Sequence, residues 1–463
     1  MPCRGYLIAV VASLSVSCPV VQASEPWRLE EILKAPDWLT VSGNARIRYE
    51  TLDGQFRAAN GGTSDQLLAL RTLIHARASF DKVTFGAELQ DARTYLDDGG
   101  TPLSTSFTNA GEALQAYADL HLDHLLGWQK ETDLKLGRFT LDVGSRRAVE
   151  RNSFRNTINN YDGAHLRMRL SDETRLEVFY VSPVRKQPRD RQALDDNEIS
   201  GDETESNRQF WGVYVQQQDL WLDVTGEIFA YGLHEADTAH RQTPDREVYW
   251  PGVRIFRKPS SQQLDFEVEA ATRFGTRRAT PDPADTTQLN VDAQMLHAEI
   301  GYTFEGDWMP RLNFEYDLAT GDNDQNDQSF TNWERFFGTR RGDLGNTSIH
   351  GPLTRSNLSA PGARFSFDNR QKGLDGRIVY QAAYLAEAED RFIVGRLQDP
   401  SGASGKFIGH TLDARVRKWL VEDNLRLEVG ASALFFGGYL KNVPDGPGGR
   451  RTLFGYTQLT ASF

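Results

Sequence analysis

Residues 134–170 read LKLGRFTLDVGSRRAVERNSFRNTINNYDGAHLRMRL, a basic stretch inside a chain whose formal net charge is −12. Eight cations stand against three acids there, and they are Lys135, Arg138, Arg146, Arg147, Arg151, Arg155, Arg167 and Arg169. At both ends of the stretch, apolar residues alternate with polar ones. A period of two is typical of β-strands, with the arginines opposite the apolar row. If that row faces lipid, the arginines line a wet interior, whereas in a soluble protein they form a solvated basic face.

Residues 1–23 are typical of a secretory signal peptide. Arg4 precedes an apolar run over residues 7–16, and residues 21–23 form a small-residue cleavage site. The residues before Cys18 lack the leucine of a lipoprotein signal. Because Cys3 and Cys18 both lie in this segment, the mature chain is expected to lack disulfides, cysteine-based zinc sites and cysteine nucleophiles.

Composition limits the class of protein further. Removing Arg4 makes the mature chain more acidic still, which argues against a nucleic-acid partner. A chain of 463 residues would ordinarily hold about three domains unless a barrel takes up the length. After residue 23 no apolar run approaches the ~20 residues that a membrane-spanning helix needs. An exported chain of this kind is periplasmic, extracellular, or an outer-membrane barrel.

Alternation with period two recurs from one end of the chain to the other. Segments 39–50, 68–80, 264–274, 311–318 and 425–435 all show it. In one of them we expect Leu312, Phe314, Tyr316 and Leu318 to face lipid and Asn313, Glu315 and Asp317 to face the lumen. An antiparallel sandwich in water also alternates, so the connections must decide between the two folds.

Short and long connections alternate along the sequence. The short ones lie near 81, 171–173, 218–219, 259–262, 305–308 and 421–424. The long ones span 95–111, 142–160, 182–207, 233–246, 275–290, 321–358, 388–408 and 437–451. This pattern predicts an all-β fold, a transmembrane antiparallel β-barrel of about eighteen strands with short periplasmic turns and long extracellular loops. We expect a short periplasmic segment at 24–37 and the barrel at 38–463, placed in the bacterial outer membrane.

Tryptophans stand near the ends of the apolar rows, where a barrel places its interfacial aromatic girdles. These residues are Trp38, Trp128, Trp211, Trp250, Trp308 and Trp419. We expect them to mark the two edges of the lipid layer.

Motifs for catalysis or metal binding are weak. On a strand, His121 and Asp123 face one way and His124 the other, which favours a polar strand end over a metal site. The acidic loop from Asp322 has Asp327 where a helical calcium loop requires glycine. The sequence contains no nucleophile elbow and no phosphate-binding glycine loop. It therefore predicts no enzyme, no cofactor and no metal centre, leaves loose calcium binding by the acidic loop open, and makes an outer-membrane hydrolase the less favoured class.

Transport fits the residues better. A guanidinium is permanently charged and its fork matches a carboxylate, so an arginine-lined pore attracts anions. The candidate lumen residues are Arg46, Arg48, Arg71, Arg77, Arg138, Arg167, Arg169, Arg254, Arg273, Arg311, Arg364, Arg415, Arg417 and Arg426, with Glu315 and Asp413 among the acids that keep them ordered. Arg138 shares parity with Leu134 and Leu136, so either a bulge turns it inward or the strand has left the lipid layer there.

The chain resembles the alginate export family of outer-membrane porins. The resemblance is carried by LKLGRFTLDVGSRR from 134, RLNFEYDLATGDND from 311, FTNWERFFGTRRGDLG from 330, GHTLDARVRKWL from 409 and NLRLEVGASALFFGGYL from 424. It implies an eighteen-stranded barrel whose arginine-rich constriction passes a uronic-acid polymer. The matching positions implicate Arg138, Asp413, Lys418 and Arg426, whereas Arg146 and Arg147 have no counterpart in the resemblance.

The sequence thus predicts a channel for alginate or a similar acidic polysaccharide. A porin for the uptake of acidic oligosaccharides or small anions is the alternative, because the same scaffold serves either direction of transport. The expected partners are the polysaccharide or oligosaccharide, outer-membrane lipid, and periplasmic export or uptake components.

Overall fold

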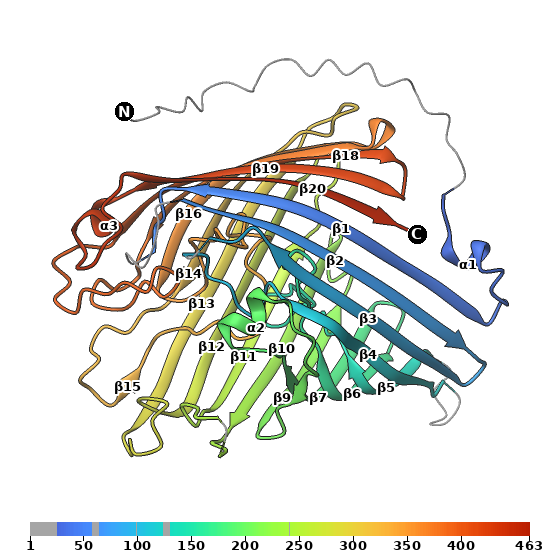
Figure 1. The fold of residues 1–463 in the computed structure, drawn as a ribbon, viewed down its shortest axis with the longest axis horizontal. Helices are drawn as coiled ribbons and strands as arrows, with labels where there is room; N and C mark the ends of the chain where they lie inside the picture. Colours follow the sequence, from blue (N-terminus) through green and yellow to red (C-terminus); the bar gives the residue numbers. More distant parts are fainter. Residues whose placement is uncertain (1–25, 58–63, 99, 124–129, 240) are drawn as a thin grey trace.

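Eighteen long antiparallel strands close into a barrel in the computed structural model of the chain (Figure 1). The structure describes residues 26–57, 64–98, 100–123, 130–239 and 241–463. The first strand, β1 (Leu39–Asp53), pairs with the last, β20 (Arg451–Ser462), from Asn44 opposite Ser462 onwards. This pairing joins the two ends of the sheet, so that their backbone groups are hydrogen-bonded within the hydrocarbon layer. The predicted fold class is confirmed.

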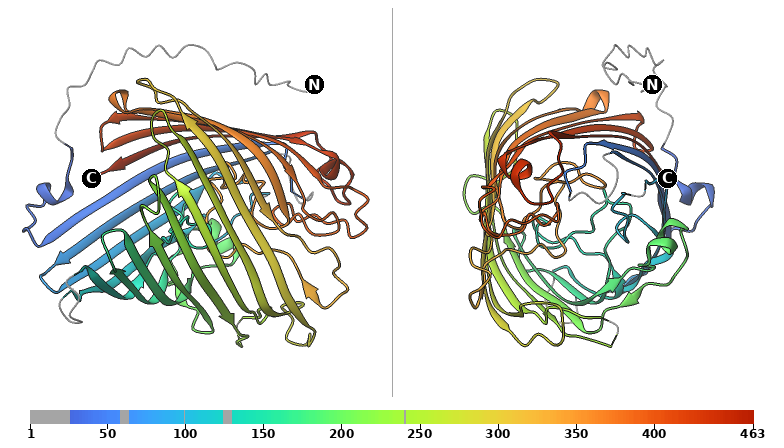
Figure 2. Two further views of the ribbon diagram at one scale, coloured as in Figure 1. Left: turned by 180° about the vertical axis from the view of Figure 1, so that it is seen from behind. Right: turned by 60° about the vertical axis from the view of Figure 1, so that its left-hand side comes forward.

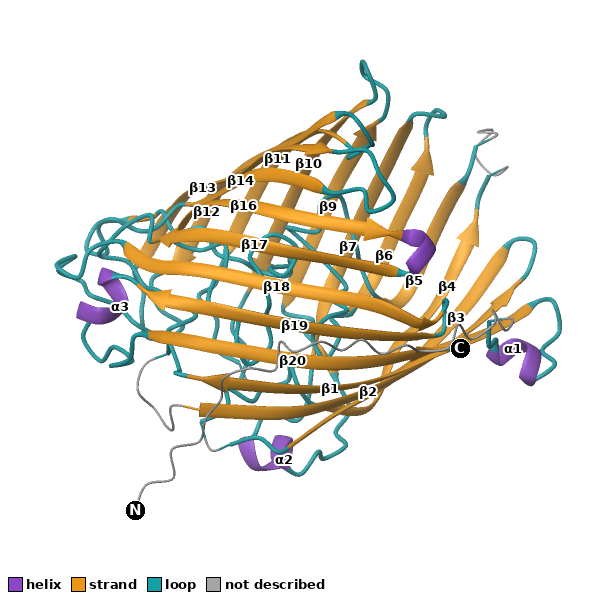
Figure 3. Ribbon diagram, turned by 90° about the horizontal axis from the view of Figure 1, so that it is seen from above, coloured by secondary structure: helices purple, strands orange, loops and turns teal. Residues whose placement is uncertain are grey.

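The other wall strands follow in chain order around the barrel (Figure 3). They are β2 (Ser64–Ser79), β3 (Val83–Tyr95), β4 (Asn109–His121), β5 (Thr132–Phe139), β6 (Tyr161–Arg169), β7 (Thr174–Arg185), β9 (Arg208–Gln217), β10 (Val224–Glu235), β11 (Glu247–Arg257), β12 (Leu264–Arg278), β13 (Gln288–Thr303), β14 (Arg311–Ala319), β16 (Leu358–Asn369), β17 (Leu374–Tyr384), β18 (Phe407–Val421) and β19 (Leu425–Phe436). The smaller elements are β8 (Glu203–Thr204), β15 (Ser329–Phe330), α1 (Leu29–Ile32), α2 (Arg191–Asp195), α3 (Gly438–Asn442) and the 3₁₀ turn η1 (Arg370–Lys372). Within the described ranges, none of the helices is long and apolar enough to cross a membrane.

Short turns gather at one end of the barrel and long loops at the other, as the sequence predicted. The periodicity did not reveal three of the connections, which lie at 54–63, 122–131 and 370–373. In β14, Leu312 and Phe314 point outward and are exposed, while Asn313 and Asp317 are fully buried inside. The side chains of this strand therefore alternate between lipid and lumen as expected.

Two long loops fold back into the barrel and fill its interior. They are residues 140–160 after β5, called here the first inner loop, and residues 320–357 after β14, the second inner loop. The right-hand view of Figure 2 looks along the barrel and shows loop segments crossing it. Leu141 and Val149 of the first loop and Leu344 and Leu353 of the second are buried in one hydrophobic cluster with inward-facing strand residues. The main core of this protein thus lies within its own lumen.

The aromatic-girdle prediction is wrong for two of its tryptophans. Trp250 is only 2% exposed and lies in the interior cluster, and Trp419 shares the lumen face of β18 with Asp413 and Arg417. Nearness to a strand end does not fix the side of the wall, because the side depends on parity within the strand. Trp38 and Trp308 are exposed at the short-turn end, as a girdle requires.

Some predictions fall on residues outside the described ranges. They concern the signal peptide at 1–23, Trp128 and His124. The division into residues 24–37 and a barrel from 38 onwards stays a prediction.

Cysteine labelling tests the two faces of the wall. The sequence has no cysteine after Cys18, so single substitutions give clean reporters. Phe314→Cys should react with a membrane-restricted maleimide, and Arg77→Cys with a water-soluble one, because Phe314 is 60% exposed on the outer face and Arg77 faces the lumen. Reaction of Phe314→Cys with the water-soluble reagent alone would contradict this arrangement.

Candidate functional site

The two inner loops are joined to each other at the centre of the barrel. Val149 and Phe337 form a parallel bridge, and the Thr339 amide donates to the carbonyl of Arg146 at 3.0 Å. Gly338 sits directly against the first loop, because a Cβ at this position would overlap the carbonyl of Arg147. Only glycine permits this approach without a shift in the backbone.

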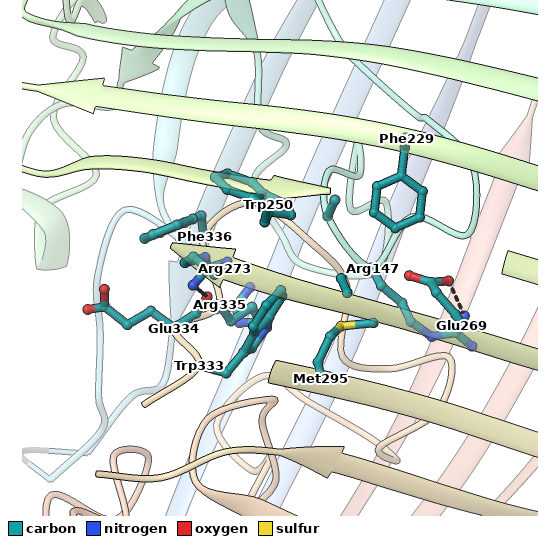
Figure 4. Close-up of a pocket in the computed structure, with 12 residues that line it drawn as sticks. Arg147, Phe229, Trp250, Glu269, Arg273, Met295, Trp333, Glu334, Arg335 and Phe336 are labelled. Atoms are coloured by element: carbon teal, nitrogen blue, oxygen red, sulfur yellow. Dashed lines mark hydrogen bonds and ion pairs between the residues drawn. The ribbon is translucent and has the colours of Figure 1, made fainter. Parts of the chain in front are cut away.

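Arg147 is the charged centre of this junction (Figure 4). Its side chain is 5% exposed, and Nη1 pairs with Glu267 and, at 2.7 Å, with Glu269 on β12. Its Nε pairs with Asp343 of the second loop at 3.0 Å. One guanidinium therefore ties both loops to the wall, and its loss would leave three carboxylates without their shared cation.

A second guanidinium completes the junction from the other side. Arg355 pairs with Asp317 on β14 at 2.8 Å and also with Asp343. Burial opposes the ionisation of Asp343, but Arg147 and Arg355 outweigh it and hold the pKa of Asp343 well below its usual range. His297, Asp317 and Asp343 have ligand atoms within 4.8 Å of one another, as a metal site would. Because guanidiniums already pair with both carboxylates, this group serves as an ion-pair network.

Three of the predicted lumen arginines hold the first inner loop in place. Arg46 donates to the carbonyls of Ser153, Phe154 and Arg155 at 2.9–3.0 Å, and Arg71 donates to two of the same carbonyls. Arg48 donates to the Phe154 carbonyl at 2.6 Å and pairs with Glu50. All three face inward as predicted, but they are buried and their donors are used by the loop.

Arg273 holds the second inner loop in a different way. Its guanidinium lies 4.0 Å from the ring centre of Trp333 and 4.4 Å from that of Phe336, both loop residues, and 4.7 Å from that of Trp250. It donates to the Glu334 carbonyl at 2.7 Å. Aromatic faces stabilise a desolvated cation, so Arg273 anchors the loop without a carboxylate.

A cluster of cations lies on the long-loop side of the junction. Arg57, Arg155 and Arg340 line a cavity of about 170 Å³, and Arg335 is their electrostatic neighbour. We call these four residues the outer arginine cluster. Burial and the three other members lower the pKa of Arg340. Among the described residues, no carboxylate lies within 4.0 Å of any of the four guanidiniums. The nearest carboxylate charges, those of Asp65 and Glu150, thus act on the cluster only from beyond ion-pair distance.

A second group of arginines lies beneath the tip of the second inner loop. The arginine arc consists of Arg364, Arg377, Arg415, Arg417 and Arg426 on strands β16 to β19. Arg377 and Arg415 stand directly opposite each other, an unfavourable placement for like charges. Arg377 donates to the loop carbonyls of Arg341 and Gly342 at 2.8 and 3.0 Å, which offsets part of that repulsion.

The arc also has a surplus of positive charge. Arg364 pairs with Glu315 at 2.6 Å, and Arg417 pairs with Asp375 at 2.8 Å, which Arg415 reaches only at 3.9 Å. Among the described residues, Arg426 has no carboxylate within 4.0 Å, and its guanidinium lies over the ring of Trp419. Five guanidiniums thus share two carboxylates. Asp413 accepts hydrogen bonds from Asn346 of the loop and from Ser432, and within the described part of the chain it forms no ion pair within 4.0 Å with an arginine of the arc.

The remaining lumen candidates lie near the short-turn end. Arg311 pairs with Glu299 at 2.8 Å and with Asp265, and Arg254 pairs with Glu267 at 2.7 Å. Arg167 pairs with Asp119 at 2.7 Å, and Arg169 pairs with Glu131 at 3.3 Å. Arg77 is exposed on the lumen face of β2. All of these residues face inward.

Two predicted lumen residues lie on the outer side of the wall. Arg138 keeps the outward parity of Leu136 because β5 and β6 pair without a register shift, and it pairs with Asp162 and Glu112 near the long-loop end. The strand has left the lipid layer there, and no bulge turns Arg138 inward. Lys418 shares its side of β18 with Leu412 and Val416, and its ammonium donates to the carbonyl of Lys372 in a turn.

Sequence reasoning missed the charged residues of the loops themselves. These are Arg57, Arg147, Arg155, Arg335, Arg340, Arg341, Asp343 and Arg355, together with Arg377 on β17. The signal was present, because Arg147 and Arg155 stand in the basic stretch and Arg335 to Asp343 in FTNWERFFGTRRGDLG. Periodicity assigns faces only within strands, so it could not show that these loops enter the lumen.

Comparison with known proteins gives a family and a fold. A sequence profile described as alginate export matches residues 37–454. The fold is similar to the outer membrane protein OpdK of Pseudomonas aeruginosa, with a TM-score of 0.60 at 10% identity, covering 92% of this chain and 98% of that one. It is also similar to OccK9 (OpdG) of the same organism, with a TM-score of 0.59 at 13% identity and the same coverage.

A third similar structure carries a ligand. It is OccK2 (OpdF) of Pseudomonas aeruginosa in complex with glucuronate, with a TM-score of 0.55 at 11% identity, covering 92% of this chain and 96% of that one. No curated protein matches the chain. The barrel, its family and its porin-like relatives indicate a channel of the bacterial outer membrane.

Removing the central guanidinium should release the inner loops. In Arg147→Ala, Glu267, Glu269 and Asp343 lose their shared partner, which should weaken loop docking by about 3–5 kcal/mol. We expect larger and noisier single-channel conductance in planar bilayers and faster tryptic cleavage within 320–357. The matched control is Arg146→Ala, whose side chain is 56% exposed. Equal behaviour of the two variants would contradict the role of Arg147.

A lysine beside the outer arginine cluster should make anion selectivity depend on pH. Burial and the nearby Arg155 lower the pKa of Lys186 to about 7, while its ammonium donates to Thr157 and Asn159. Lys186 is charged below that pH and neutral above it, so anion selectivity should fall as pH rises from 6 to 8. Burial also raises the pKa of Asp202 to about 6, which adds a smaller step in the same direction.

Reversal potentials at pH 6, 7 and 8 measure this effect. Lys186→Met should remove the step near pH 7, whereas Asp202→Asn should keep the step but move it to lower pH, because the Asp202 charge raises the pKa of Lys186. A wild-type profile that stays flat over this range would show that Lys186 does not titrate there.

Proposed function

The chain belongs to the alginate export family, and from this premise we propose that it conducts an anionic polysaccharide, alginate or a similar uronic-acid polymer. The polymer carries one carboxylate on each sugar ring. A conduit for it needs cations that bind each carboxylate in turn and release it again.

The surplus of guanidiniums on both sides of the loop junction carries this proposal. The outer arginine cluster lies on the long-loop side, and the arginine arc lies beneath the loop tip. Arg340 and Arg341 are adjacent in sequence but point to opposite sides of the loop junction. Arg340 lines the outer cavity, whereas Arg341 pairs with Glu428 on β19. Successive carboxylates of a polymer could thus exchange between one cluster and the other along the second inner loop.

Carboxylates beside the arc favour transit over trapping. Glu315 and Asp375 compete with the polymer for Arg364 and Arg417, so that each contact with the substrate is weakened. A charge-assisted hydrogen bond contributes about 1.5–3 kcal/mol, and several uncompensated ones in series would hold a polyanion too tightly to move. Multiple weak sites permit conduction.

The alternative is a porin for acidic oligosaccharides or small anions. OccK2, which has a similar fold, was determined in complex with glucuronate, a single acidic sugar. The two functions differ in how block depends on length. A polymer conduit should be blocked for longer as a uronate oligomer grows from a dimer to a hexamer, whereas a porin for small anions should show no increase beyond the dimer.

Neutralising the outer arginine cluster should reduce anion selectivity. The variant Arg57→Gln/Arg155→Gln/Arg340→Gln removes three cations from the cavity wall. We expect the chloride-to-potassium permeability ratio and the affinity for uronate oligomers to fall roughly tenfold, since one lost charge-assisted bond already accounts for this amount. Reversal potentials and current block in planar bilayers measure both quantities.

A control variant that loses the same number of cations elsewhere separates the effect of the cavity from the effect of net charge. Arg28→Gln/Arg370→Gln/Lys418→Gln removes three cations that are exposed outside the lumen. Its permeability ratio should stay close to that of the wild type. A cation-selective wild-type pore, or equal losses in the two triple variants, would refute the proposed conduit.

A further inference from the structure

A separate cavity of about 440 Å³ opens in the lumen wall near the short turns. All of its lining residues come from β2 to β6 and the turns that join them, so neither inner loop contributes to it. Its size falls in the range of small-ligand sites. We call it the mouth cavity.

Tyr117 forms a flat platform in the mouth cavity. Across the sheet, Gly86 lies between Arg77 on β2 and Tyr117 on β4, and a Cβ on Gly86 would overlap the tyrosine ring. The ring therefore lies over bare backbone at this point. Lys135 places its ammonium 4.3 Å from the ring centre, which fixes the ring further.

Four carboxylates and three cations line the mouth cavity, and one of these cations, Arg77, is not paired with any of the carboxylates. Arg167 and Lys135 share Asp119, at 2.7 and 3.5 Å. Arg77 is exposed, and within the described part of the chain no carboxylate lies within 4.0 Å of its guanidinium. A free guanidinium thus stands beside a flat aromatic face, with only the glycine between them in the sheet.

A chain of hydrogen bonds makes the wall of the cavity rigid. His121 contacts Asp133 at 2.6 Å through Nδ1 and the Thr84 hydroxyl at 3.1 Å through Nε2. The order hydroxyl, imidazole, carboxylate is that of a hydrolase triad, but Thr84 is only 4% exposed and cannot reach a substrate. These groups fix the positions of the polar atoms around the platform.

We propose that the mouth cavity binds one acidic sugar residue at the periplasmic mouth of the channel. The sugar lies against the side chain of Tyr117 beside the Lys135 ammonium, and its carboxylate pairs with Arg77. The proposal rests on the proposed function and adds a first or last binding position for the polymer, separate from the arginine clusters around the inner loops.

Block by a mannuronate trimer from the short-turn side tests the subsite. The full-length protein in planar bilayers is compared with Arg77→Gln and Tyr117→Val, and circular dichroism confirms that Tyr117→Val is folded. Both variants should shorten the residence of the trimer on that side by about tenfold, the effect of one charge-assisted bond. Maltotriose, which has no carboxylate, should show no difference between wild type and Arg77→Gln.

Arg175→Gln is the matched control, because Arg175 on β7 is a lumen cation near the same mouth that neither lines the cavity nor pairs with a residue that does. It should change the residence time less than twofold. An effect as large as that of Arg77→Gln would assign the block to overall charge and overturn the subsite. Residence times unchanged in Arg77→Gln would overturn it as well, while leaving the proposed function intact. A wild-type pore that the trimer does not block from either side would refute both.

Discussion

The hydrocarbon layer requires apolar side chains on one face of every strand, and it thereby collects the charged side chains of all the strands in one closed interior. The net charge of the whole chain then says little about the charge of the lumen, because acidic residues of the exposed loops contribute to the total of −12. Inside, each guanidinium competes for a limited set of carboxylates and carbonyls. The arrangement of partners, and not the number of arginines, decides what the interior can bind.

The inner loops are the main competitors for these arginines. Arg46, Arg71 and Arg273 face the lumen, yet they donate to loop carbonyls, so they stabilise the inner loops and have few donors left for a substrate. Backbone carbonyls satisfy a guanidinium without neutralising it, and the positive potential of these residues persists around the loops. Arg147 differs, since three carboxylates surround it and cancel its charge. Anchoring and attraction of anions overlap in the outer arginine cluster, because Arg57 and Arg340 also donate to carbonyls of the second inner loop while no carboxylate neutralises them at ion-pair distance.

The fold was predictable because period-two alternation and the alternating loop lengths both follow from the physics of a lipid-facing barrel. The same alternation correctly placed Arg48, Arg311 and Arg415 on the lumen side of their strands. Arg138 was misplaced because it was listed with the lumen arginines although its parity put it beside Leu136. Lys418 was misplaced because it was carried over from the resemblance, whereas its parity put it beside Val416. Arg57, Arg340 and Arg355 were out of reach for a different reason. A loop has no periodicity, and its entry into the barrel depends on long-range contacts such as that of Gly338 with Arg147.

Loop docking and anion binding are linked through the second inner loop. Arg340 lines the outer cavity, while Asp343, three residues on, is held by Arg147 and Arg355. A carboxylate bound among Arg57, Arg155 and Arg340 relieves repulsion that exists only while the loops are docked. By thermodynamic linkage, the bound carboxylate stabilises the docked loops by the difference between its binding free energies for the docked and the released forms. If the proposed function holds, an anion in the outer cavity would keep the two inner loops docked, and the leading carboxylate of a polymer would make the junction more rigid for the sugars that follow.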